Sequence, residues 1–441
     1  MNLQQPTVGV TKAGKLPSVV DTVLPNGLRV LAARKPGVPM VQVRLRIDVA
    51  RSKGWGDGII EEATTQTMAA GTESRTQLDI AEELRALGAV MSTNVDTEDL
   101  FVVGTTVSTE LASYLALLDD VLEHGTHPED EVALTKGQLE QQLAIMASQP
   151  EARAHYALAE RLFPGHPYGM AMPTPDLVGP ITRGQIRKFH KSMITPSAAL
   201  IVLVGDMPPA KMVAAVEKAL GGWTGSRRVG KTPKPGPVAV GPIRVVHNPG
   251  AVQTNMRFGG FGVNRTSPDF PALTLALVIL GGGFTSRLNH NLREDKGYTY
   301  GAQAGMSHNL AATQVTIGAD VQTAVTAPAF VETMYELGRM ATNPVSEEEL
   351  ADAKRYLAGS LALSVQTQSG LASYLTTLAM NGLDVSYLRD LPAAADKLTV
   401  DDIAAASAKY LSPSALAPVL LGDADEIGDA VALLGAVEIR S

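Results

Sequence analysis

The feature that most constrains the fold of this chain is an internal repeat. Residues 181–206 match residues 398–423 without a gap at an offset of 217, and they share a Pro-Ser-Ala triplet and a final Gly-Asp. A second pair of segments, 128–139 and 346–357, lies one residue from the same offset, and each begins with an acidic turn. Two matches at nearly one offset indicate a duplicated domain. The chain is therefore expected to fold twice in the same way.

Apolar periodicity predicts the local structure of the first copy. Alternating β-branched residues predict strands over 27–34 and 41–49, and an apolar run predicts a third over 198–206. The other predicted elements are helices over 59–70, 76–87, 109–124, 128–147 and 150–162, and strands within 89–108. Thr76 is a suitable N-cap for its helix, with Asp79 three residues later. This mixture, with abundant Ala, Val, Leu and Gly, is typical of a soluble α/β or α+β protein.

A segment rich in Pro and Gly, 225–242, separates the two copies. Both residue types disfavour regular structure, so we expect an extended linker between a first domain over 15–224 and a second over 243–438. Its first residues, GSRRVGKT (225–232), satisfy the P-loop pattern. A P-loop needs a strand before it and a helix after it, and the prolines that follow cannot continue a helix. We therefore predict no nucleotide at this segment.

Composition excludes several classes of function. The chain has no cysteine, so neither a disulfide nor a cysteine-ligated metal can form. Its formal net charge of -8 argues against nucleic acid as a partner. Every apolar run is shorter than the roughly 20 residues that cross a bilayer, so no membrane span is expected. The N-terminal sequence has no recognisable signal peptide, which favours the cytoplasm, or the periplasm if such a peptide was removed.

Histidines and paired acids do not reveal an active site by themselves. His124 and His127 lie three residues apart at a helix end broken by Gly and Pro, where the helix dipole favours histidine without any metal. His190 falls in a helical stretch and is expected on the surface or in the core. Glu61 and Glu62 are adjacent on a predicted helix, so their side chains point in different directions. A solvated helix face is the simpler interpretation of that acidic pair.

Five stretches of the sequence occur in an order typical of one protein family. They are LPNGLRVL (24–31), GTESRT (71–76), LFPGHPYG (162–169), AALIVLVGD (198–206) and GGGFTSRLNHNLREDKGYTYG (281–301). Together they resemble the pitrilysin/insulysin family of zinc peptidases, which includes the mitochondrial processing peptidase and the cytochrome bc1 core proteins. The resemblance spans nearly the whole chain, and the last stretch is its most specific part. It implies an α+β fold in which two homologous α/β domains follow in tandem, each a mostly antiparallel sheet covered by helices, and together form half of a clamshell.

Active members of that family bind zinc through an H-x-x-E-H motif, in which the glutamate is the base for the attacking water. Counted back from Gly71, the two histidine positions of the motif hold Glu62 and Gln66, and the glutamate position holds Thr65. Counted from Gly58, the histidine positions hold Glu61 and Thr65, and the glutamate position holds Thr64. The third zinc ligand of the family, a glutamate on a later helix, aligns with Gln142. A neutral amide is a poor zinc ligand. The resemblance thus implies a lost metal site, with no zinc and no other cofactor in this chain.

Two donors of the family's non-metal half are retained. Arg293 precedes Tyr300 by seven residues, and Gly297 between them is expected to end a helix. In the family, an Arg and a Tyr at this spacing reach across to the zinc half, bind substrate carbonyls and help to stabilise the tetrahedral oxyanion. The alternative is that Arg293 pairs with Glu294 or Asp295 on the surface and that Tyr300 packs within a strand.

Three consecutive glycines, Gly281, Gly282 and Gly283, precede these donors. They predict a sharp turn between two helices, with backbone conformations that only glycine adopts readily. They also resemble, in a shorter form, the glycine-rich substrate loop of the processing peptidase's noncatalytic subunit. They are therefore a candidate substrate loop.

The resemblance also implies a function for a chain of this length, because half-size members of the family work as two-chain clamshells. We expect a noncatalytic, substrate-binding subunit of a heterodimeric zinc metallopeptidase, which is not catalytic alone. The expected partner is a homologous half-size subunit that carries H-x-x-E-H and the zinc, and the expected substrate is a peptide or an unfolded protein. One alternative is a structural core-type subunit of a larger complex without a peptidase role. Another is an independent peptidase that binds metal through unexpected ligands.

Overall fold

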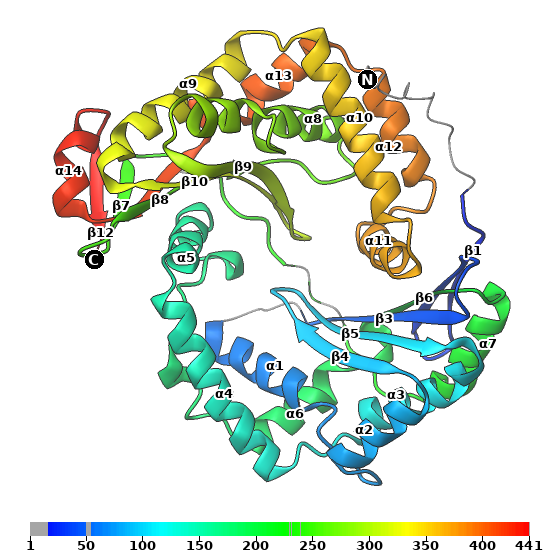
Figure 1. Cartoon of the computed structure of the whole chain (residues 1–441). Helices are drawn as coiled ribbons and strands as arrows, with labels where there is room; N and C mark the ends of the chain where they lie inside the picture. The colour runs from blue at the N-terminus through cyan, green and yellow to red at the C-terminus, as the bar shows by residue number, and fades with distance from the viewer. Residues whose placement is uncertain (1–15, 50–53, 229, 231, 239, 441) are drawn as a thin grey trace, which may run out of the picture.

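The computed structural model describes residues 16–440 except 50–53, 229, 231 and 239, and it contains two six-stranded sheets (Figure 1). The first, in the order β1-β2-β6-β3-β5-β4, comprises β1 (Val19–Val23), β2 (Arg29–Arg34), β3 (Met40–Asp48), β4 (Val90–Val95), β5 (Asp99–Val107) and β6 (Ala199–Gly205). The second, in the order β12-β7-β11-β8-β10-β9, comprises β7 (Ile243–His247), β8 (Gln253–Phe261), β9 (Thr299–His308), β10 (Thr313–Gln322), β11 (Ala417–Gly422) and β12 (Val437–Arg440). Most neighbouring strands are antiparallel, which confirms the predicted fold class.

Helices cover both sheets. Those of the first half are α1 (Gly54–Thr67), α2 (Gln77–Ala86), α3 (Leu111–His124), α4 (Glu129–Ser148), α5 (Pro150–Leu162), α6 (Arg183–Met193) and α7 (Pro209–Leu220). Those of the second half are α8 (Phe270–Gly281), a π-helix (Asn289–Asp295), α9 (Thr326–Thr342), α10 (Glu347–Ser364), α11 (Gln368–Met380), α12 (Tyr387–Asp396), α13 (Val400–Tyr410) and α14 (Ala424–Ala432). The predicted helix over 150–162 has the observed bounds of α5, and the Thr76 capping box with Asp79 is present at the start of α2. Strand β1 and the π-helix were not predicted.

The internal repeat occupies equivalent positions in the two sheets. Strands β6 and β11 are each third in their sheet, parallel to β2 or β7 on one side and antiparallel to β3 or β8 on the other. The helices before them, α6 and α13, both begin with a capping box, formed by Thr182 with Gln185 and by Thr399 with Asp402. The duplication is therefore confirmed. The copies differ at the outer strand, because β1 is antiparallel to β2 whereas β12 is parallel to β7.

Each half contributes one helix to the sheet of the other half. Leu158 and Leu162 of α5 pack against Ala417 and Val419 of β11 in the second sheet. On the opposite side, α11 packs its leucines against the first sheet, in a cluster that includes Leu200 and other residues of β2 and β6. Figure 1 shows α5 and α11 lying between the two sheets. The two halves are thus joined by exchanged helices as well as by the linker.

Burial on both faces explains the apolar composition of the central strands. Every residue of β6 is buried, and its alternate residues enter two different clusters: Ile201 and Leu203 face α3 and α7, whereas Val202 and Val204 face α11. A strand covered on both faces reads as a continuous apolar run rather than an alternating one. The sequence therefore indicates two covering layers but does not identify the helices that supply them.

The segment between the sheets has no helix or strand among its described residues from 225 to 242. The helix that a P-loop requires after its lysine is thus lacking in this part of the chain. The domain limits 15–224 and 243–438 remain a prediction. None of the described helices combines the length and the apolar character needed to cross a membrane.

Candidate functional site

The residues at the family's metal positions on α1 form hydrogen bonds within their own helix. On α1, the Nε2 of Gln66 donates a hydrogen bond of 2.8 Å to Oε1 of Glu62, one helical turn earlier. The Thr65 hydroxyl is buried and donates to the carbonyl of Glu61, at 2.8 Å. Gln142 lies on an exposed position of α4. In the other sequence register, the Thr64 hydroxyl is likewise bonded to its own helix backbone.

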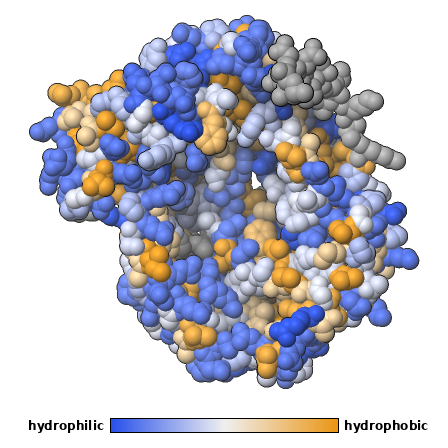
Figure 2. All heavy atoms as spheres, in the orientation of Figure 1, coloured by the Kyte–Doolittle hydropathy of each residue, from blue (hydrophilic) through white to orange (hydrophobic). Residues whose placement is uncertain are grey.

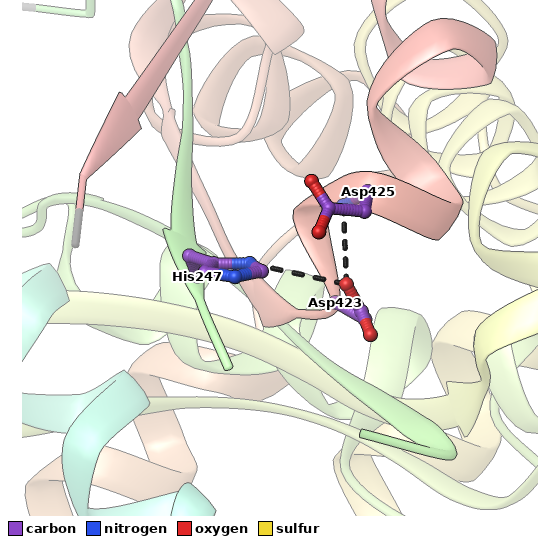
Figure 3. A group of neighbouring side chains, drawn as sticks. All are labelled: His247, Asp423 and Asp425. Carbon is purple, nitrogen blue, oxygen red and sulfur yellow. Dashed lines mark hydrogen bonds and ion pairs between the residues drawn. The ribbon is translucent and has the colours of Figure 1, made fainter. Parts of the chain in front are cut away.

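One group of side chains in the described chain has the spacing of a metal site, but it is a helix cap (Figure 3). His247, Asp423 and Asp425 place ligand atoms within 4.8 Å of one another. The Asp423 carboxylate, however, accepts the backbone N–H groups of Asp425 and Gly250, at 3.1 and 2.7 Å. The Nδ1 of His247 accepts the backbone N–H of Ala424, at 3.1 Å. These contacts satisfy the free amide groups at the start of α14, which is the ordinary role of an N-cap.

We expect the purified chain to hold no stoichiometric zinc. Thr65, Glu62 and Gln66 are engaged in local hydrogen bonds, and zinc requires three or four convergent nitrogen, sulfur or carboxylate ligands. Metal analysis after dialysis against a weak chelator checks this expectation, with His247→Asn as a control for the capping group. One tightly held zinc per chain, removable only by a strong chelator, would contradict it.

Arg293 lies on the π-helix and projects from its exposed side. Its guanidinium stacks over the ring of Phe284 at 4.8 Å from the centroid, and its Nε lies 3.6 Å from a carboxylate oxygen of Glu294. The Glu294 pairing was one of the alternatives expected from sequence. Because both partners are exposed, that ion pair is weak and leaves the guanidinium accessible. Gly297 has φ of 65° just after the π-helix, so its predicted role in ending the helix is correct.

Tyr300 lies at the start of the edge strand β9 and is 94% exposed. The alternative interpretation, in which its ring packs within a strand, is therefore wrong. Pairing between β9 and β10 is irregular here, because Tyr300 and Gly301 lie opposite the single residue Asp320. Such a bulge changes the direction of a side chain and often occurs next to functional sites. Among the described residues, no hydrogen bond joins the side chains of Arg293 and Tyr300.

The three glycines lie at the C-terminal end of α8, but they do not have the backbone conformation that the sequence predicted. None of Gly281, Gly282 and Gly283 has a positive φ. A Cβ on Gly281 would instead lie 2.5 Å from the backbone nitrogen of Ala304, so this glycine allows α8 to approach β9. Gly283 contributes its carbonyl, which accepts a hydrogen bond of 2.9 Å from Nδ2 of Asn289. The expectation of a left-handed glycine turn is therefore corrected to a close helix–strand contact.

Buried polar contacts fix the inner side of the π-helix to neighbouring helices. Nδ2 of Asn291 donates to Glu332 and Glu336 of α9, at 3.0 and 2.9 Å. Just before the π-helix, Arg287 forms two hydrogen bonds to Glu349 of α10, at 2.6 and 2.9 Å. These bonds lower the pKa of Glu349 to about 2, so the pair is ionised at neutral pH. The segment that carries Arg293 is thus rigidly supported.

The far end of β9 is attached to the first half of the chain. After β9, the backbone N–H of Leu310 donates to Glu98 at 2.8 Å, and that of Ala311 donates to the hydroxyl of Tyr168 at 3.1 Å. The Tyr168 hydroxyl also donates to Glu98, and burial raises the pKa of that carboxyl group. The β9–β10 hairpin therefore bridges the two halves, and no motif in the sequence predicts this contact.

A cavity of about 470 Å³ lies elsewhere, at the junction of α4, α5 and β8. Its lining includes Met146, Gln149, His155, Tyr156 and Arg257, but neither Arg293 nor Tyr300. In the orientation of Figure 1, the molecular surface is hollowed between the two sheets (Figure 2). Met146 lies one helical turn after Gln142 on α4.

A buried histidine pair supports the first half, and its role was not predicted. Nε2 of His190 lies 2.8 Å from the carbonyl of Leu122, which can only accept, so this nitrogen carries a proton. Nδ1 of His190 lies 2.8 Å from Nε2 of His127, and Nδ1 of His127 lies 2.7 Å from the hydroxyl of Thr67, which donates to the carbonyl of Ala63. Burial lowers the pKa of both rings, so both are neutral at pH 7. The interpretation of His127 as a dipole-stabilised residue at a helix end is wrong, because its side chain is fully buried.

The comparisons with known proteins agree with the fold. Residues 180–357, which include α8, the π-helix and β9, match the family model described as the peptidase M16 inactive domain. A solved structure of a peptidase M16 inactive domain from Pseudomonas fluorescens has a TM-score of 0.85 at 25% identity, covering 92% of this chain and 98% of that chain. Residues 180–357 are thus similar to the M16 peptidase family, and the chain as a whole shares the fold of that solved M16 structure.

Several curated relatives match the chain over nearly its whole length. An uncharacterized zinc protease of Mycobacterium leprae is 24% identical over 413 residues, which cover 93% of each chain. One of Streptomyces coelicolor is 23% identical over 432 residues, covering 94% of this chain and 93% of that protein. The periplasmic protease PqqL of Escherichia coli shares the fold with a TM-score of 0.79 at 16% identity, but the present chain covers only 47% of it. The resemblance to this family of zinc peptidases that the sequence predicted is thus confirmed, and the family model that matches is the one described as inactive.

Proposed function

We propose that this chain is the noncatalytic subunit of a two-chain zinc peptidase, in which it supplies Arg293 and Tyr300 to the partner's active site. The observation that carries the proposal is the exposure of Tyr300, which is 94% exposed although Thr299 and Ala302 on either side of it are hydrogen-bonded. An exposed ring gains little from burial in its own chain. A fixed and exposed phenol is instead suited to contact another molecule.

The chemistry of peptide hydrolysis uses donors of this kind. Attack of water on a peptide carbonyl creates negative charge on the oxygen, and a preorganised donor aimed at that oxygen contributes on the order of 3 kcal/mol. The guanidinium of Arg293 provides several N–H donors in a planar fork, and the Tyr300 hydroxyl provides one. The π-helix and the edge strand present both groups on supported elements, as a donor site requires.

The first half explains why a partner is needed. The residues at its metal positions are Glu62, Thr65, Gln66 and Gln142, and no histidine occurs among them. The partner would be a homologous half-size M16 subunit that carries H-x-x-E-H and a zinc ion. The two chains would form a clamshell around a peptide or an unfolded protein segment, in the cytoplasm or the periplasm.

Mixing the two subunits tests this proposal. The gene for a half-size M16 chain with H-x-x-E-H is co-expressed with this chain, and cleavage of an internally quenched, unstructured peptide is followed. We expect peptidase activity from the complex, with little from either chain alone, because one half supplies the metal and the other supplies the donors. Chelation of the zinc should abolish that activity.

A second candidate function, a structural core-type subunit, is favoured by one specific observation. Arg293 already has two partners in its own chain, the ring of Phe284 and the carboxylate of Glu294. If the complex assembles but the zinc subunit is equally active without this chain, the structural function is the correct one.

A further inference from the structure

Two irregular elements carry the two proposed donors. Arg293 lies on a π-helix, a rare form that is enriched at functional sites, and Tyr300 lies in a β-bulge. No backbone hydrogen bond joins the π-helix to β9 among the described residues. Side-chain contacts between the two elements therefore bear on the separation between the two donors.

The side chain of Asn289 makes this connection. It is the first residue of the π-helix and is 4% exposed. Its Nδ2 donates to the carbonyl of Ala302 at 2.8 Å, and its Oδ1 accepts the N–H of Ala302 at 2.9 Å. The carboxamide thus pairs with both backbone groups of Ala302, as a neighbouring strand would. It covers the free edge of β9 only two residues after Tyr300.

The same carboxamide also holds the preceding turn. Nδ2 of Asn289 lies 2.9 Å from the carbonyl of Gly283 and 3.1 Å from the hydroxyl of Ser286. The end of α8, the π-helix and β9 therefore meet at one buried side chain. On the other side of Tyr300, the Thr299 hydroxyl donates to the carbonyl of Asp320 at 2.8 Å, which holds the bulge against β10.

We propose that Asn289 is a positioning residue, which sets the location of Tyr300 relative to Arg293 by clamping Ala302 to the π-helix. This inference rests on the proposed function, since it concerns the same two donors. Only an uncharged carboxamide fits the clamp, because it needs a donor facing one carbonyl and an acceptor facing one N–H. An aspartate would place a second negative oxygen against the Ala302 carbonyl, and an alanine would leave both groups of Ala302 unpaired.

Two variants and a matched control test the inference in the assembled complex. Asn289→Asp and Asn289→Ala are compared with Asn26→Asp, because Nδ2 of Asn26 likewise donates to two main-chain carbonyls, those of Leu220 and Trp223, in the other half. With the quenched peptide as substrate, we expect both Asn289 variants to lower kcat about tenfold with KM within about twofold, since a displaced donor acts mainly in the transition state. Asn26→Asp should leave kcat unchanged.

A double-variant comparison separates positioning from a general structural effect. In a chain that already carries Arg293→Lys and Tyr300→Phe, removal of Asn289 should lower kcat by less than about twofold, because no donor remains to be positioned. If the loss is as large as in the wild-type background, the inference is wrong while the proposed function stands. If Arg293→Lys and Tyr300→Phe themselves have no effect, the proposed function fails and the inference with it.

Hydrogen exchange on the wild-type chain keeps the inference testable if the variants do not fold. The Ala302 amide should exchange much more slowly than that of Met306, which has the same orientation on the edge strand because residues alternate. Equal exchange at the two amides would show that the clamp does not form, and the inference would be overturned.

Discussion

Tyr300→Phe and Arg293→Lys are each expected to lower kcat of the assembled peptidase about a hundredfold, which is the loss observed when one oxyanion donor is removed. Tyr300→Phe removes one hydroxyl and keeps the ring, and Arg293→Lys keeps the charge but loses the planar fork. Because Tyr300 is 94% exposed, its change should not affect folding of the subunit. Steady-state cleavage of the quenched peptide by the reconstituted complex measures the effect.

A second exposed pair in the chain provides the control. On α9 the guanidinium of Arg339 lies over the ring of Tyr335, at 5.5 Å from the centroid, so it matches the stacking of Arg293 on Phe284. Tyr335→Phe and Arg339→Lys should cleave at the wild-type rate, because that pair has no proposed contact with substrate. Complex formation, measured by analytical ultracentrifugation, should be the same for all four variants. Wild-type rates for Tyr300→Phe and Arg293→Lys would instead favour the structural core-type function.

Acidification is expected to destabilise the first half through the His127–His190 pair. Burial, with a smaller contribution from His190, lowers the pKa of His127 to about 3, and burial also lowers the pKa of His190. A histidine in the unfolded chain has a pKa near 6.5, so between these values the unfolded state binds more protons. The free energy of unfolding therefore has its full value above about pH 6.5 and decreases as the pH falls toward 3. For His127 alone, the free energy of unfolding decreases by about 2 kcal/mol between pH 7 and pH 5.

Burial gives the physical reason for this sensitivity. His127 is 0% exposed and His190 is 7% exposed, so a charged imidazole at either position would be removed from water. Asn tolerates the backbone of His127, whose φ is 49°, so His127→Asn is a suitable variant. Urea unfolding at pH 7 and pH 5 should show a smaller pH effect for His127→Asn than for the wild type. His124→Asn, three residues earlier, serves as control, and equal pH effects in wild type and His127→Asn would refute the prediction.

Much of the fold could be predicted because its signals are local. The capping boxes of Thr76, Thr182 and Thr399 depend on residues three positions apart, and the structure contains all three. The repeat at offset 217 required equivalent positions for β6 and β11, which the sheets show. By contrast, the π-helix and the bulge at Tyr300 have no period in the sequence, because they arise from contacts of Asn289, Asn291 and Asp320 with other elements.

For the candidate site, the sequence identified the residue types but not their surroundings. The family spacing pointed to Arg293 and Tyr300, and the missing histidines pointed to an inactive member of the family. The sequence predicted the wrong role for Gly281. This glycine is required by the approach of Ala304 and not by a left-handed turn. The pairing of Asn289 with Ala302 joins residues 13 positions apart through side-chain geometry, which no short motif encodes.

The sequence by itself determined that this chain folds twice in the same way, that it has no H-x-x-E-H site, and that it keeps an Arg and a Tyr seven residues apart. These features follow from residue identity and short spacings, which do not depend on how the chain folds. Only the tertiary structure decided that α5 and α11 cover each other's sheets, that His127 is buried and neutral, and that one carboxamide joins the two donor elements. Those features depend on which surfaces remain uncovered after each half folds, because apolar faces and unpaired backbone groups are satisfied by whatever lies nearest in space.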